Sequence, residues 1–144
     1  MALEGEYATE KAGWVSDQLA KIDETGTTAS VDVAGMAVVV FTYRGPKSGK
    51  LYRRPLMRVE HDGVYAAVAS KGGAPEHPAW YGNITANPEV EVHDGIRHID
   101  GVAREISGAE REEWWERAVA AFPPYAEYQT KTDRKIPIFV LEPR

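Results

Sequence analysis

The chain has 144 residues, a formal net charge of −5 and no cysteine. This length suits one domain with its own core, and the missing thiols exclude disulfides, thiolate metal sites and a cysteine nucleophile. The longest apolar run, AVVVF at 37–41, is too short to cross a bilayer, and the polar N-terminus lacks the pattern of a signal peptide. We therefore expect a cytoplasmic protein, and the acidic composition argues against a nucleic-acid partner.

The first thirty residues are polar and predict a helix over about 8–24, which ends at the turn signals Gly26 and Thr27. The continuously apolar, β-branched run at 35–43 predicts the first core strand. We divide the chain into an N-terminal helical segment, 1–34, and a β domain, 35–144.

Two Asp-Gly pairs predict β-hairpins. Asp62 and Gly63 separate apolar runs at 51–60 and 64–70, and Asp94 and Gly95 lie between two further strands within 90–106. Between the hairpins, the segment HPAWYGNITANP predicts a short helix because prolines bound it at both ends.

The C-terminal third predicts one more helix and one more strand. Ser107 and Glu110 form a capping-box pattern, and two prolines at 123 and 124 stop the helix that follows. The run IPIFVLEP at 136–143 predicts a closing strand. About six strands, mostly linked by hairpins and flanked by helices, predict a mainly β (α+β) fold, closed as a small antiparallel barrel without open edges.

A basic run stands out in this acidic chain. Between Tyr43 and Arg58 there is no acidic residue, and none occurs from Val33 to Val59, so we expect these cations to lack local partners. Such a loop attracts phosphate or carboxylate, although a solvated hairpin whose cations cover apolar surface is the alternative. The basic residues are Arg44, Lys47, Lys50, Arg53, Arg54 and Arg58.

Two other stretches are candidate pocket walls. ASKGGAPEHP, at 69–78, places Ser70 and Lys71 at the mouth of a strand. Its glycines alone fit an ordinary connection, whereas Trp80 and Tyr81, which follow shortly, favour a planar ligand. Tyr125 and Tyr128 follow Phe122 at intervals of three and suit either a pocket lid or core packing.

The four histidines do not predict a metal site. His61 and His93 directly precede Asp-Gly turns, and none of the four shows an HxH or HExxH spacing.

Five strings, taken in order, resemble the deazaflavin (F420)-dependent nitroreductase and F420H2-dependent quinone reductase family: GPKSGKLYRRPL, AAVASKGGA, HPAWYGNITANPEVEV, FPPYAEYQ and TDRKIPIFVLEP. The resemblance runs from about Ala37 to Pro143. It implies a split β-barrel of the FMN-binding type, coenzyme F420 as the hydride donor, and a quinone, nitro compound or enone as the acceptor. It also implies an actinobacterial or archaeal source.

The resemblance assigns residues to the cofactor, whose phosphodiester and oligoglutamate tail would explain the basic run. These residues are Pro46, Lys47, Ser48, Gly49, Lys50, Tyr52, Arg53, Arg54, Pro55, Leu56, Met57, Val68, Ala69, Ser70, Lys71, Ala79, Trp80, Tyr81 and Asn83. Ser70, Tyr125 and Tyr128 are the candidate catalytic donors. Tyr52, Met57 and Phe122 depart from the family pattern.

Three rival functions stay open at this point. An FMN-dependent oxidoreductase on the same barrel would need fewer cations for its shorter tail. A carrier would bind the deazaflavin or a lipid-like molecule without catalysis, and an interaction module would dock an acidic partner on the basic loop. A homodimer is compatible with all of them, whereas membrane contact through the acidic N-terminal helix is poorly supported.

Overall fold

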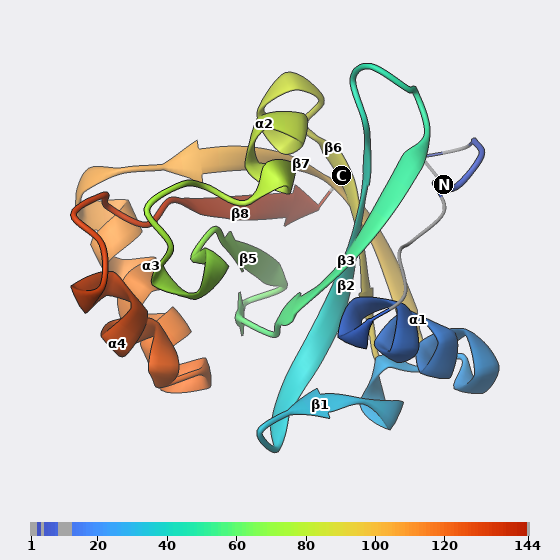
Figure 1. Ribbon diagram of the computed structural model, residues 1–144, viewed down its shortest axis with the longest axis horizontal. Coiled ribbons are helices and arrows are strands. Elements are labelled where there is room, and N and C mark those ends of the chain that lie inside the picture. The colour runs from blue at the N-terminus through green and yellow to red at the C-terminus, as the bar shows by residue number, and fades with distance from the viewer. Residues whose placement is uncertain (1–2, 4, 9–12, 144) are drawn as a thin grey trace.

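The computed structural model describes residues 3, 5–8 and 13–143. Within them, one curled antiparallel sheet is flanked by helices (Figure 1). The strands are β1 Asp32–Val33, β2 Met36–Arg44, β3 Leu51–Met57, β4 Glu60–His61, β5 Val64–Val68, β6 Glu89–Asp94, β7 Arg97–Ile106 and β8 Ile138–Pro143. The helices are α1 Trp14–Thr25, α2 Ala79–Ala86, α3 Gly108–Ala121 and α4 Pro124–Thr130, with short 3₁₀ turns η1 Thr28–Ser30 and η2 Lys71–Gly73.

The predicted split β-barrel is confirmed. The strands follow the order β1-β2-β6-β7-β8-β5-β4, and β3 pairs with β2. The expectation of a barrel without open edges is wrong, because no strand pairing joins β3 to β5 in the described residues. The Ala66 N–H donates to the Val59 carbonyl at 2.9 Å, which extends the β4–β5 hairpin by one residue pair toward β3.

The two hairpins form, but with different registers. Asp62 and Gly63 both have positive φ, 53° and 82°, as a type I′ turn requires. In the second hairpin Asp94 instead pairs with Arg97 between β6 and β7, and Gly95, with φ 63°, is the first residue of the turn. The predicted placement of Asp94 in the turn is therefore wrong.

The helices differ from the sequence expectation at their ends. Helix α1 begins at Trp14, and the Ala8 N–H donates to the Leu51 carbonyl at 2.8 Å, so no helix starts at residue 8; residues 9–12 lie outside the described part. Ser107 precedes α3, yet its side chain makes no capping bond. The capping box does not form because Glu110 binds Arg104 at 2.8 and 2.9 Å. Helix α4, which begins at the second of the two prolines, was not expected.

Three apolar clusters hold the fold together. Helix α2 packs Trp80 and Ile84 against residues of the sheet such as Phe41 and Phe139, while α3 and α4 pack on β5 and β8. Helix α1 lies across the other side of β2, where its buried leucine and isoleucine contact Val40 (Figure 1). No helix in the described ranges is long and apolar enough to span a membrane.

Candidate active site

The first cavity has a volume of about 520 Å³ and is bounded by β3, η2, α2, α4 and the start of α1. It brings together residues that lie far apart in the sequence. The predicted residues that line it are Arg54, Pro55, Leu56, Met57, Val68, Ser70, Lys71, Ala79, Trp80, Tyr125 and Tyr128. Its walls are mostly apolar, with a few polar groups, which is the usual character of a small-molecule site.

A second group of predicted residues lines a smaller cavity of about 280 Å³ beside the loop that joins β2 to β3. Figure 1 shows this loop rising next to α2. The predicted residues there are Pro46, Lys47, Ser48, Tyr52 and Asn83.

Both cavities are bounded by β3 and α2, and we call the surface between these two elements the groove. Alternate residues of a strand share a face, so Tyr52 of the small cavity follows Arg54 and Leu56 of the large one on β3. On α2, Trp80 faces the large cavity and Asn83, three residues later, faces the small one. A long molecule can therefore lie between β3 and α2, with one end in each cavity.

The remaining predicted cofactor residues lie outside these two cavities. Gly49 and Lys50 are exposed on the loop, and Ala69 is fully buried beneath the large cavity. The Tyr81 hydroxyl donates to Glu105 at 2.7 Å.

The basic run is divided by the fold. Arg53 binds both oxygens of Asp23 at 2.7 and 3.0 Å, and this bond holds the pKa of Asp23 below its usual value. Arg58 likewise binds both oxygens of Asp94, at 3.1 and 3.0 Å. The partners of these two arginines are remote in the sequence, so the absence of local partners did not leave them unpaired.

The exposed lysines of the loop differ from those arginines. Neither Lys47 nor Lys50 has a carboxylate partner among the residues that the structure describes. Lys47 lines the small cavity, and Lys50 is exposed three residues further along the same loop. Arg54 lines the large cavity, and Arg44 donates to the Gly49 carbonyl at 2.6 Å, which fixes the loop. Cations thus stand at both cavities, Lys47 at the small one and Arg54 at the large one.

The opposite end carries hydroxyl donors. Tyr125 is only 4% exposed, and burial, followed by the neighbouring Tyr128, raises the pKa of its phenol, which stays protonated at neutral pH. Its ring packs edge-on against Tyr128 at 6.2 Å. Within the described residues, the hydroxyls of Tyr125 and Ser70 have no hydrogen-bond partner, so both can donate to a bound molecule.

Arg134, which sequence reasoning did not single out, holds the mouth of the large cavity in place. Its guanidinium donates to the carbonyls of Ala69 at 3.1 Å, Ser70 at 2.7 Å and Ala74 at 2.9 Å, and lies 3.1 Å from His77 Nδ1. The TDRKIP string contained this arginine, but spacing alone could not show that it reaches sixty residues back.

Gly73 fixes the distance between that loop and α4. Its φ is 85°, and a Cβ built there would lie 2.6 Å from the Tyr128 carbonyl oxygen. The glycine therefore allows the η2 loop to approach the backbone of α4. The sequence had suggested that it would allow the loop to approach a flat ligand.

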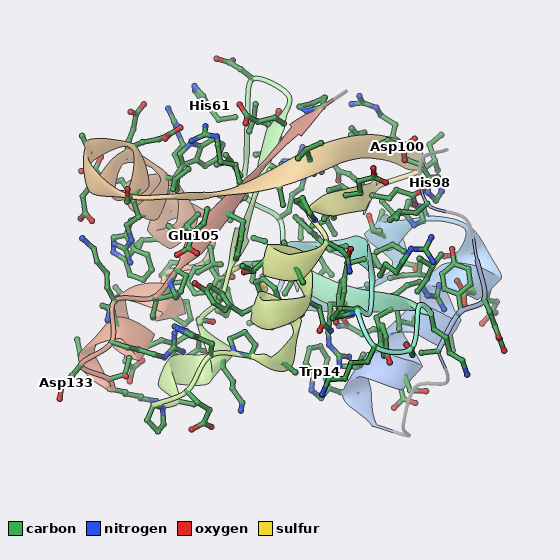
Figure 2. The ribbon with its side chains drawn as sticks, turned by 90° about the horizontal axis from the view of Figure 1, so that it is seen from above. Trp14, His61, His98, Asp100, Glu105 and Asp133 are labelled. Carbon is green, nitrogen blue, oxygen red and sulfur yellow. The ribbon has the colours of Figure 1, made fainter. Side chains whose placement is uncertain are left out.

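The start of α1 is a further part of the site that the sequence did not reveal. Trp14, Val15 and Gln18 line the large cavity. Figure 2 shows Trp14 between α1 and the segment that leads into α2, and its side chain is 62% exposed. A lone tryptophan on a polar helix was the only signal in the sequence.

Three residues depart from the family pattern. Met57 and Phe122 also line the large cavity, whereas the ring of Tyr52 stacks on that of Tyr43 with 5.8 Å between the ring centroids.

An apolar cavity with hydroxyl donors, beside a loop with exposed lysines and on a split β-barrel, suits an oxidoreductase that holds a flat, anionic cofactor. The profile of the F420H(2)-dependent quinone reductase family matches residues 14–143. The chain therefore belongs to this family and is an oxidoreductase that uses coenzyme F420.

Relatives and solved structures agree with this assignment. A putative F420H(2)-dependent quinone reductase of Mycobacterium tuberculosis, Rv3178, is 33% identical over 106 residues, which cover 74% of this chain and 89% of that protein. An F420-H2 dependent reductase (FDR-A) of known structure is 61% identical, with a TM-score of 0.71 over 73% of this chain and 93% of that one. A structure described as a domain-swapped dimer is 58% identical, with a TM-score of 0.74 over 90% and 97% of the two chains.

Proposed function

We propose that this protein transfers hydride from reduced coenzyme F420 to a quinone, or to a nitro compound or enone of similar electron demand, and that the groove between β3 and α2 binds the cofactor. The observation that supports the proposal best is the position of unpaired Ser70 and Tyr125 hydroxyls in the same groove whose far end carries Lys47.

The residues of the groove fit the cofactor at both ends. The large cavity offers apolar walls for a flat ring, with Trp80 and Leu56 on either side, while Lys47 and Lys50 can bind the phosphodiester and glutamate carboxylates. Arg53 is held by Asp23 and lines a different cavity, so its predicted contact with the cofactor needs that ion pair to open.

The chemistry comes from the cofactor, which when bound supplies a hydride and does not readily react with oxygen. The chain's own part is to orient the acceptor and to stabilise the negative charge that grows on its oxygen. Tyr125, Tyr128 and Ser70 are the donors within reach of that cavity, and a protonated phenol can also deliver a proton. Phe122 and Trp80 add apolar surface to the wall of the same cavity.

The test is anaerobic mixing of the protein with reduced coenzyme F420 and a panel of one quinone, one nitroarene and one enone. We expect deazaflavin absorbance to return fastest with the quinone. Parallel titration with FMN tests the rival cofactor, and tight binding of coenzyme F420 without oxidation by any acceptor would indicate a carrier.

The assembly and location belong to the same proposal. We infer a homodimer because a protein 58% identical to this chain is described as a domain-swapped dimer. Light scattering coupled to size exclusion would show a mass near 32 kDa, about twice the 15.9 kDa of one chain. The cytoplasmic location expected from the sequence remains a prediction that fractionation would test.

A further inference from the structure

A third cavity, of about 510 Å³, lies where the last turn of α1 crosses the sheet. It shares no lining residue with the groove of the proposed active site, so it is a separate place on the molecule. Its volume is within the range of small-molecule sites. Nothing in hydride transfer to a quinone requires it.

The strand register explains which side chains meet in this cavity. Thr42 of β2 pairs with Arg53 of β3 on one side and with Glu91 of β6 on the other. One step along the same face, His93 of β6 pairs with His98 of β7. Residues two apart on a strand share a face, so Glu91 and His93 point to the same side of the sheet.

Glu91 is a buried carboxylate with one oxygen unused. Its side chain is 5% exposed, and its Oε1 lies 2.8 Å from His98 Nδ1. Its Oε2 is buried and has no hydrogen-bond partner in the described part of the chain. A buried carboxylate oxygen without a donor is costly, which marks the place where a donor would bind.

His93 offers a second unused atom in the same cavity. Its Nε2 is also buried and without a partner among the described residues, and its ring stacks on His98 at 4.1 Å. Burial, followed by the charge of His98, lowers the pKa of His93, so its ring is neutral at pH 7. With its proton on Nδ1, the neutral ring presents Nε2 as an acceptor.

The remaining charges of the cavity do not satisfy these two acceptors. The Arg53 guanidinium, which also lines the cavity, binds both oxygens of Asp23 and does not reach these acceptors among the described contacts. The described residues contain no cluster of three or more His, Asp or Glu side chains that could hold a metal ion. We propose that this cavity binds a small organic cation with N–H donors, of the primary amine or diamine class, through Glu91 Oε2 and His93 Nε2.

The proposal is tested by calorimetry on the full chain loaded with coenzyme F420, using 1,4-diaminobutane as the probe at low ionic strength. Tetramethylammonium serves as a second probe because it carries the charge without any N–H donor. The Glu91→Gln variant removes the carboxylate at nearly constant shape. Glu113→Gln, which changes an exposed carboxylate on α3, is its matched control.

We expect the diamine to bind once per chain, with its Kd raised at least tenfold by Glu91→Gln and unchanged by Glu113→Gln, and no heat from tetramethylammonium. In the wild-type chain, long-range ¹H–¹⁵N spectra should show the imidazole signals of His93 shifting on addition of the diamine, which decides the matter even if Glu91→Gln fails to fold. Absence of both heat and shift would mean that the cavity holds only water and would overturn the proposal. Diamine binding that coenzyme F420 abolishes would place the ligand in the other groove and would overturn it too.

Discussion

Tyr125 is the residue whose removal should separate chemistry from binding. Its phenol is buried, protonated and unpaired within the described residues, so its loss removes a donor without removing a contact that the cofactor's anionic tail needs. We expect Tyr125→Phe to lower kcat about 10- to 100-fold and to leave the Kd for coenzyme F420 nearly unchanged.

The control for this prediction is Tyr65→Phe, which removes another buried hydroxyl, the one that donates to Asp94 far from the groove. That variant should lose stability and keep its kcat. Single-turnover kinetics under anaerobic conditions measure the step directly, and an equal loss of rate and cofactor affinity in Tyr125→Phe would contradict a role in the reaction.

Lys47 should act in the opposite way. It is exposed and has no acidic partner among the described residues, so its charge is available to an anionic tail. We expect Lys47→Ala to raise the Kd for coenzyme F420 about three- to tenfold at low ionic strength, with little change in kcat and a weaker dependence on salt.

Arg53→Ala is the matched comparison, since the two cations lie six residues apart. Its guanidinium is engaged by Asp23 on α1, so its loss should weaken the packing of that helix more than it weakens cofactor binding. If both variants raise the Kd equally, the Arg53–Asp23 pair opens when the cofactor binds.

The sequence could not predict which cations of the basic run are bound by carboxylates of the chain itself. The stretch from Val33 to Val59 contains no acidic residue, but the partners of Arg53 and Arg58 stand thirty and thirty-six residues away in the chain. Only the fold decides which charges cancel. The apolar lining, in contrast, could be expected, because Leu56, Trp80 and Tyr125 lie in strings whose order and spacing resemble the family.

The loop of η2 and helix α4 fit together through a glycine, and this contact can be tested. Gly72 and Gly73 both have positive φ, 64° and 85°, but a Cβ at Gly72 would meet nothing within 4 Å, whereas one at Gly73 would lie 2.6 Å from the Tyr128 carbonyl. We expect Gly72→Ala to cost about 1 kcal/mol of unfolding free energy through backbone strain alone.

Gly73→Ala should cost about 2–4 kcal/mol, because the same strain is joined by a clash with the backbone of α4. Urea unfolding followed by circular dichroism measures both values. The variant should also lower kcat, since α4 carries Tyr125 and Tyr128. Equal costs for the two alanines would show that the loop relaxes freely away from α4.

The elements themselves show where local signals suffice. The hairpin at Asp62 and Gly63 formed as expected because the turn type depends on those residues alone. The second hairpin shifted by one residue because Asp94 is bound in the sheet by Arg58 and Tyr65, contacts with residues remote in sequence. The capping box at Ser107 failed for a similar reason, since Arg104 takes Glu110.

Considered as a whole, the molecule is a split barrel with α1 laid across one side, and the sequence predicted the barrel better than the place of the helix. Hairpin order is a local property, whereas the described residues form eight strands, including the two-residue β1 and β4, where about six were expected. The first turns of α1 line the large cavity and its last turn lines the third cavity. This position of the helix depends on the packing of its thin apolar stripe on Val40. The division into 1–34 and 35–144 stays a prediction.

The acid stability of the whole protein should depend on His93. Its pKa in the folded state is lowered by burial, so between about pH 6.5 and that lower value the unfolded chain binds a proton that the folded chain refuses. The free energy of unfolding therefore rises with pH in this window and falls as the pH drops through it, with a slope of at most about 1.4 kcal/mol per pH unit.

We expect His93→Gln to flatten the dependence of the unfolding free energy on pH below about pH 6.5, measured by urea titration. His61→Gln, at an exposed hairpin position, should leave it unchanged. Identical slopes for wild type and His93→Gln would mean that burial does not hold His93 neutral, and would also remove one of the two acceptors proposed for the third cavity.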